Sequence, residues 1–120
     1  MKSTNRPEQL NVNKPLQLCF EFCDTKHLPN SKNDVGLVID ALKAFSNQQI
    51  LKSRGHHCLD ESGKSDYVKS LFSKTKEKLE SIDVGHRNGR QGDKRLIYYR
   101  DSVTNVAKIL TVFCDDHKKK

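Results

Sequence analysis

This chain of 120 residues has no tryptophan, one methionine, four cysteines and no long run of apolar residues. A membrane-spanning helix needs about 20 consecutive apolar residues, so none is expected. The opening segment lacks the apolar core and the small-residue cleavage site of a secretory signal. Four cysteines in a chain with its own core indicate reduced thiols rather than disulfides. The sequence therefore predicts a soluble cytoplasmic protein with no membrane partner.

Phosphate-binding glycine motifs and convincing metal sites are also missing. Neither a Walker-type loop nor G-x-G-x-x-G occurs. On a strand, Cys19 and Cys23 would lie roughly 13 Å apart at ~3.3 Å per residue, which is too far for two ligands of one zinc ion. Asp34 and Asp40 would point to different faces of a helix, which disfavours a magnesium site. We expect no metal and no cofactor, with zinc and Mg²⁺ as weaker alternatives.

Positive charge is abundant and concentrated towards the C-terminal end. The chain carries 22 Lys and Arg against 15 Asp and Glu, a net charge of +7. Residues 86–120 hold nine of these cations and four of the carboxylates, which is a net +5 of that total. This distribution favours an anionic partner such as RNA, DNA or an acidic protein.

A β-hairpin is the clearest structural prediction. Residues 94–100 and 106–114 are rich in β-branched and aromatic residues, and a polar turn over 101–105 joins them. Side chains alternate along a strand, so the first arm would place Lys94, Leu96 and Tyr98 on one face and Arg95, Ile97 and Tyr99 on the other. This arrangement predicts a rigid surface that combines basic and aromatic side chains.

The upstream elements predict the rest of the fold. Residues 1–14 are expected to be a flexible lead-in, and 15–120 a single domain. Residues 16–23 alternate as in a half-buried strand. A helix is expected from Asn33 or Asp34 to about Lys52, then a polar loop over 53–64 and a second helix over 65–82. The apolar stripe of the first helix would be Val35, Val38, Leu42 and Phe45. The order predicts an α+β fold, with two helices on one face of a small, mostly antiparallel sheet.

The C-terminal third resembles the RelE/YoeB/ParE superfamily of bacterial toxins. The resemblance rests on K-R-L-I-Y-Y-R at 94–100 and I-L-T-V-F-C-D-D-H at 109–117. It implies a RelE-like fold, a phosphate-contacting arginine at Arg95 and a closing histidine at His117. The longer loop over 53–64 departs from the family, and no carboxylate matches the general base that some members use.

Cleavage of RNA by its own 2′-hydroxyl needs a cation at the phosphate and groups that move protons. We predict a metal-independent endoribonuclease of toxin type with catalytic residues Arg95, His117 and His86. The expected RNA-binding residues are Arg87, Arg90, Lys94, Tyr98, Tyr99, Arg100, Lys118 and Lys119. The expected partners are RNA, including ribosome-bound mRNA or tRNA, and an acidic antitoxin or inhibitor protein.

Two other classes of function fit the same residues. The protein could be a non-catalytic winged-helix-like module, with residues 65–82 in the major groove of a nucleic acid and residues 85–93 as the wing. It could also be an interaction protein whose basic face meets an acidic partner. Salt-dependent binding of nucleic acid would favour the winged-helix-like module over the interaction protein.

Overall fold

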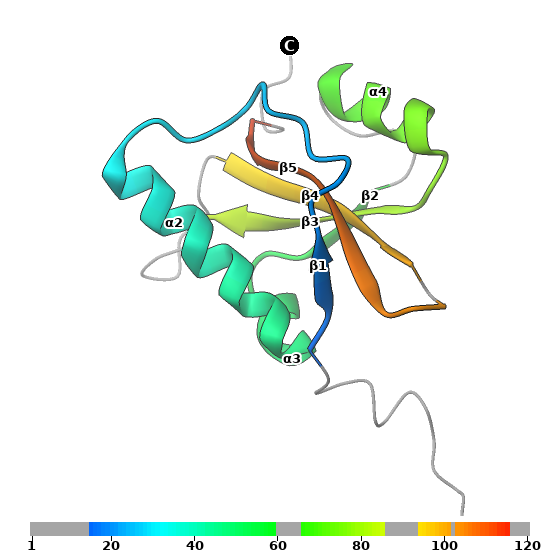
Figure 1. Cartoon of the computed structure of the whole chain (residues 1–120), viewed down its shortest axis with the longest axis horizontal. Coiled ribbons are helices and arrows are strands. Elements are labelled where there is room, and N and C mark those ends of the chain that lie inside the picture. The colour runs from blue at the N-terminus through cyan, green and yellow to red at the C-terminus, as the bar shows by residue number, and fades with distance from the viewer. Residues whose placement is uncertain (1–14, 60–65, 86–93, 102, 116–120) are drawn as a thin grey trace, which may run out of the picture.

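A five-stranded sheet forms the centre of the fold (Figure 1). The computed structural model of the chain describes residues 15–59, 66–85, 94–101 and 103–115. The strands lie in the order β1-β5-β4-β3-β2, and β1 and β5 run parallel while the other neighbours are antiparallel. Their bounds are β1 Gln17–Cys19, β2 His57–Leu59, β3 Leu79–Val84, β4 Lys94–Asp101 and β5 Val106–Cys114. The predicted α+β class is confirmed.

The predicted C-terminal hairpin is present as β4 and β5. Its turn is held by Asp101, whose Oδ1 accepts hydrogen bonds from the backbone N–H groups of Val103 at 3.0 Å and Thr104 at 3.3 Å. Asn105 completes the turn with a φ of 61°. Asp and Asn suit these positions because one bonds the backbone two residues on and the other tolerates the left-handed region. Local turn chemistry therefore supports the register of the hairpin.

The first predicted helix is divided into three pieces: α2 (Lys32–Lys43), the 3-10 turn η1 (Ala44–Ser46) and α3 (Gln48–Lys52). Ser31 caps α2, and Asn47 breaks the run with φ −148° and ψ 119°. The Oδ1 of Asn47 accepts from the N–H groups of Gln49 and Ile50 at 2.8 and 3.4 Å. An asparagine that caps a new helix stops the previous one, because its own backbone must be extended. The buried stripe of this segment runs through Val38, Ala41, Ala44 and Phe45, while the predicted Val35 is 41% exposed.

The second predicted helix is too long. Helix α4 (Asp66–Thr75) ends where Lys76 adopts a φ of 57°, and Leu79–Val84 is strand β3. All residues of β3 except Glu80 are buried. Leu79 and Ile82 are three residues apart, which also fits the spacing of a helix, so the apolar pattern alone predicts either element. The winged-helix hypothesis requires residues 65–82 to form one recognition helix. In the structure, α4 has ten residues and packs Val68 and Leu71 against the sheet.

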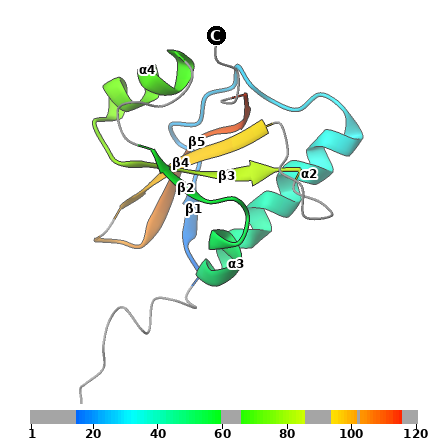
Figure 2. The ribbon, with the colours of Figure 1, turned by 180° about the vertical axis from the view of Figure 1, so that it is seen from behind.

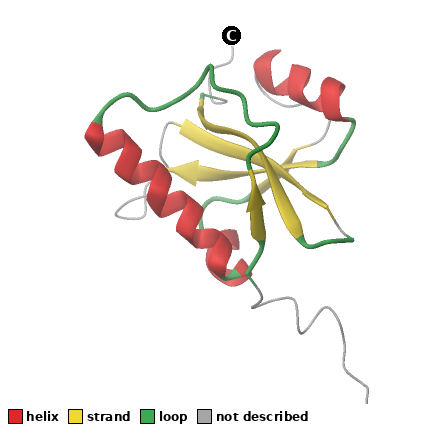
Figure 3. Cartoon of the chain, viewed as in Figure 1, coloured by secondary structure: helices red, strands yellow, loops and turns green. Residues whose placement is uncertain are grey.

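The helices cover opposite faces of the sheet, which corrects the expectation that both lie on one face (Figures 1 and 3). Leu96 and Tyr98 of β4 pack with the core under α2, η1 and α3. Ile97 and Tyr99 pack with the core under α4. The physical reason is that β4 is apolar on both sides, and a strand of that kind needs cover on both of its faces.

The two edge strands also differ from expectation. Only Gln17–Cys19 of the predicted strand over 16–23 pairs with a neighbour. The alternation places Leu16, Leu18, Phe20 and Phe22 on one face; Leu16 is buried, but the other three are 37%, 46% and 56% exposed. At the other edge, β2 lies within the segment expected to be a polar loop (Figure 2). Its residues His57, Cys58 and Leu59 have little strand propensity and depend on pairing with β3.

Candidate functional site

Arg95 lies inside the fold and is 2% exposed. Its guanidinium forms an ion pair with the carboxylate of Asp83, which is also buried. It also donates from Nε and Nη2 to Ser81 Oγ at 3.1 and 2.6 Å, and from Nη2 to the carbonyl of Gly55 at 2.7 Å. The prediction that Arg95 belongs to an exposed phosphate-binding surface is wrong, because its guanidinium is closed off from solvent against a buried carboxylate on the neighbouring strand.

Gly55 is part of this arrangement for a steric reason. Its φ is +65°, and a Cβ at this position would lie 2.5 Å from Oδ2 of Asp83. Glycine allows both the left-handed backbone and the close approach. The turn after α3 can therefore direct its carbonyl at Arg95.

The other predicted residues on β4 have different environments. Tyr98 is fully buried, so the prediction that it lies on an exposed RNA-binding surface is wrong. Tyr99 is half-buried against α4, and Lys94 places its Nζ 5.6 Å from the centre of the Phe113 ring. Arg100 is partly exposed. The remaining predicted residues lie outside the described residues: His86, Arg87, Arg90, His117, Lys118 and Lys119.

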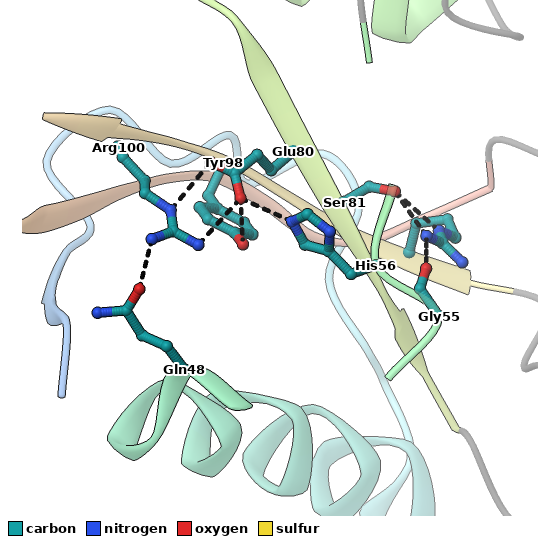
Figure 4. A network of polar contacts seen from close by, with 8 residues as sticks. Gln48, Gly55, His56, Glu80, Ser81, Tyr98 and Arg100 are labelled. Carbon is teal, nitrogen blue, oxygen red and sulfur yellow. Dashed lines mark hydrogen bonds and ion pairs between the residues drawn. The ribbon is translucent and has the colours of Figure 1, made fainter. Parts of the chain in front are cut away.

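A second polar cluster, which the sequence did not predict, is centred on Glu80 (Figure 4). One oxygen of its carboxylate, Oε1, lies 2.7 Å from Nε2 of His56, and accepts from the Tyr98 hydroxyl at 2.9 Å and from Arg100 Nη2 at 3.2 Å. The other oxygen accepts from Arg100 Nε at 3.0 Å. Arg100 also donates to the side-chain carbonyl of Gln48 at 2.6 Å. We call the set of Gln48, His56, Glu80, Tyr98 and Arg100 the Glu80 cluster.

Three elements and one connecting segment build the Glu80 cluster. Glu80 on β3 is directly opposite Tyr98 on β4, and Arg100 follows two residues later on the same face. Gln48 stands at the start of α3, and His56 lies between α3 and β2. The cluster therefore lies on the face covered by α2 and α3, whereas Arg95 lies on the face covered by α4.

The electrostatics of the cluster keep its charges in place. Burial raises the pKa of the Glu80 carboxyl, but hydrogen bonds from His56 and Tyr98 and the charge of Arg100 lower that pKa more, so the net shift is downwards. Burial lowers the pKa of Arg100, but Glu80 and its hydrogen bonds raise that pKa overall. Burial and the charge of Glu80 both raise the pKa of Tyr98, which therefore remains a donor. At neutral pH the cluster holds a carboxylate and a guanidinium.

The geometry suits proton transfer by His56. A carboxylate on one ring nitrogen fixes the orientation of an imidazole. Nε2 of His56 has this partner, and Nδ1 has no hydrogen-bond partner within the part of the chain that the structure describes. The side chains of His56 and Arg100 are 14% and 27% exposed, so both retain some contact with solvent. An imidazole with one nitrogen oriented and the other available can accept or donate a proton.

Sequence reasoning missed this cluster because Glu80 was assigned to a helix and His56 to a polar loop. Twenty-four residues separate the two, and no spacing connects them. A strand over 79–84 would have been the useful signal, since it brings Glu80 beside Tyr98 and Arg100.

Comparison with family models, with curated proteins and with solved structures found no match for this chain. Within the described ranges, no three histidine, cysteine or carboxylate side chains gather in the way that a metal ion requires. None of the helices in those ranges is long and apolar enough to cross a membrane.

Proposed function

We propose that the protein is a metal-independent endoribonuclease that cleaves RNA through attack by the 2′-hydroxyl. The observation that carries the proposal is the carboxylate of Glu80, which holds His56 Nε2 at 2.7 Å and Arg100 Nε at 3.0 Å. The Glu80 carboxylate therefore holds both His56, which would transfer protons, and Arg100, which would be the cation at the phosphate. The net charge of +7 adds long-range attraction for a polyanion.

In the proposed reaction, Nδ1 of His56 accepts the proton of a 2′-hydroxyl. The 2′-oxygen forms a bond to the adjacent phosphorus, and the bond from phosphorus to the 5′-oxygen breaks. The leaving oxygen takes a proton from solvent, and His56 returns its own proton to solvent. The products are a 2′,3′-cyclic phosphate and a 5′-hydroxyl end.

Arg100 and Glu80 have separate roles in this proposal. Arg100 stabilises the charge that develops on the phosphate oxygens, since a guanidinium matches their geometry. Glu80 is a positioning residue, because it orients His56 and Arg100 without touching the RNA. Tyr98 and Gln48 hold Glu80 and Arg100 from the protein side.

The proposal keeps the toxin-type function that the resemblance to the RelE/YoeB/ParE superfamily implies. It moves the phosphate contact from Arg95 to Arg100, and the proton transfer from His117 and His86, which lie outside the described residues, to His56. The proposed partners are unchanged: RNA, including ribosome-bound mRNA or tRNA, and an acidic inhibitor protein. The proposed location is the cytoplasm.

The test is incubation of purified protein with single-stranded RNA in the presence of EDTA, with and without ribosomes. We expect fragments that carry 2′,3′-cyclic phosphate and 5′-hydroxyl ends. The matched substrate has 2′-deoxy residues throughout and should remain intact, because it lacks the nucleophile. Intact RNA in both conditions, cleavage of the deoxy substrate, or products with 5′-phosphate ends would each overturn the proposed reaction.

A further inference from the structure

A pocket of about 530 Å³ opens on the face of the sheet that α4 covers. Its walls come from the segment after β1, from the end of α4 and from the strands β4 and β5. The residues that decide its chemistry are Phe22, Lys26, Leu71, Lys74, Tyr99 and Leu110. Pockets that hold small ligands typically measure about 300–1,000 Å³. The volume is therefore sufficient for one mononucleotide.

The apolar part of the pocket is aromatic and partly open. Phe22 is 56% exposed although it is a large apolar side chain, and Tyr99 is half-buried. Nζ of Lys108 lies 5.7 Å from the centre of the Phe22 ring. Exposed aromatic rings with cations beside them are the usual stacking surface for nucleobases, because every base has a π-face.

The polar part of the pocket carries excess positive charge. Lys26 and Lys74 both line it, both are exposed, and neither forms an ion pair with another residue of the described ranges. Two ammonium groups on one rim favour an anion.

The one carboxylate in the wall, Asp24, already has partners. Oδ2 of Asp24 accepts from the Tyr67 hydroxyl at 2.6 Å, and Oδ1 accepts from the backbone N–H of Lys26 at 2.8 Å. The bond from Tyr67 holds the loop against α4, and the bond from Lys26 lies within the loop. Asp24 keeps its negative charge and interacts with Lys26, so the two lysines leave one net positive charge on this wall of the pocket.

We propose that this pocket binds a nucleotide unit, with the base against the aromatic rings of Phe22 and Tyr99 and the phosphate at Lys26 and Lys74. A free nucleoside monophosphate and a nucleotide within single-stranded RNA offer this same chemistry. The pocket lies on the opposite face from the Glu80 cluster, so the inference goes beyond the proposed cleavage reaction and does not depend on it.

The ligand must combine both chemical features of the pocket. A sugar phosphate supplies the anion without the flat ring, and a nucleoside supplies the ring without the anion. We expect adenosine 5′-monophosphate to bind at least about tenfold more tightly than either adenosine or ribose 5-phosphate, since each of these lacks one charged or stacking contact.

The experiment is isothermal titration of the full chain with adenosine 5′-monophosphate, adenosine, ribose 5-phosphate and a single-stranded RNA hexamer. The hexamer is titrated into His56→Ala so that cleavage does not interfere. Lys26→Gln, Lys74→Gln and Phe22→Ala should each weaken binding about tenfold. Lys69→Gln removes an exposed lysine from the same helix as Lys74, outside the pocket, and should bind as wild type.

The two sources of the nucleotide give different results. If adenosine 5′-monophosphate binds more tightly than adenosine and ribose 5-phosphate, the pocket is assigned to a free nucleotide. Binding of the hexamer alone, with the same loss in the three pocket variants, assigns it to an RNA strand. The inference is overturned if neither ligand binds, or if the pocket variants and Lys69→Gln weaken binding equally. Failure of the cleavage assay would leave these binding results unaffected.

Discussion

Arg95 and Asp83 form an ion pair in which the two side chains are 3% and 0% exposed. Removing one member breaks a buried ion pair, which typically costs about 3–5 kcal/mol of folding stability. We therefore expect Arg95→Ala and Asp83→Ala each to lower the free energy of unfolding by about that amount. Urea denaturation at pH 7 measures it.

The neighbouring Lys94→Ala is the control for this prediction, since it removes a cation that is not buried and should cost about 1 kcal/mol or less. If Arg95→Ala were as stable as Lys94→Ala, the ion pair would not be the structural feature that we describe. A folded and stable Arg95→Ala protein that had lost RNA cleavage would restore the role predicted from the sequence.

Substitution of glycine by alanine should have opposite effects on stability at two positions, Gly55 and Gly36. Gly55→Ala should destabilise the fold by at least about 1–2 kcal/mol, because alanine is strained at a φ of +65° and its Cβ would meet the Asp83 carboxylate. Gly36 lies within α2 with open space around a new Cβ, so Gly36→Ala should stabilise by about 0.5–1 kcal/mol. Thermal unfolding of the two variants beside wild type tests the pair, and equal shifts of the same sign would contradict it.

Glu80 should make stability depend on pH. Its pKa is lower in the folded state than the unfolded value of about 4.3, so the stabilisation is complete above that value and is lost as the pH falls through the folded pKa. Glu80→Gln should be less stable than wild type at pH 7 and should lose less further stability on acidification. Urea midpoints measured from pH 7 downwards give the comparison.

Glu21→Gln is the control for the pH prediction, because Glu21 is exposed. Its stability should follow the wild-type curve at every pH. A Glu80→Gln curve parallel to wild type would mean that the carboxylate gains nothing from His56, Tyr98 and Arg100.

The parts of the fold that sequence reasoning predicted correctly are those set by local chemistry. The arms of the hairpin were predicted to within one residue, because β-branched residues flank a turn with Asp101 and Asn105 at its ends. The alternation along β4 was also correct, with Leu96 and Tyr98 in one core and Ile97 and Tyr99 in the other. Periods of two and recognisable turn residues are visible in a short window of sequence.

The errors concern properties that depend on distant residues. Whether Arg95 faces solvent or a carboxylate is decided by Asp83, twelve residues away on another strand. Leu79 and Ile82 fit both helical and strand spacing, and only the neighbouring strands select the strand. The same error hid Glu80, and with it the contact to His56 that carries the proposed chemistry.

The rate of RNA cleavage by His56→Ala and His57→Ala, measured side by side in EDTA, tests the central claim most directly. The two histidines are adjacent in the sequence, and His56 is the one whose Nε2 lies 2.7 Å from Glu80 Oε1. Loss of a proton-transferring side chain typically costs about 10²–10⁴ in rate, so His56→Ala should cleave at least about 100-fold more slowly. His57→Ala should cleave at the wild-type rate, with both variants folded by circular dichroism. Equal rates for the two variants, with His56→Ala as active as wild type, would contradict the account.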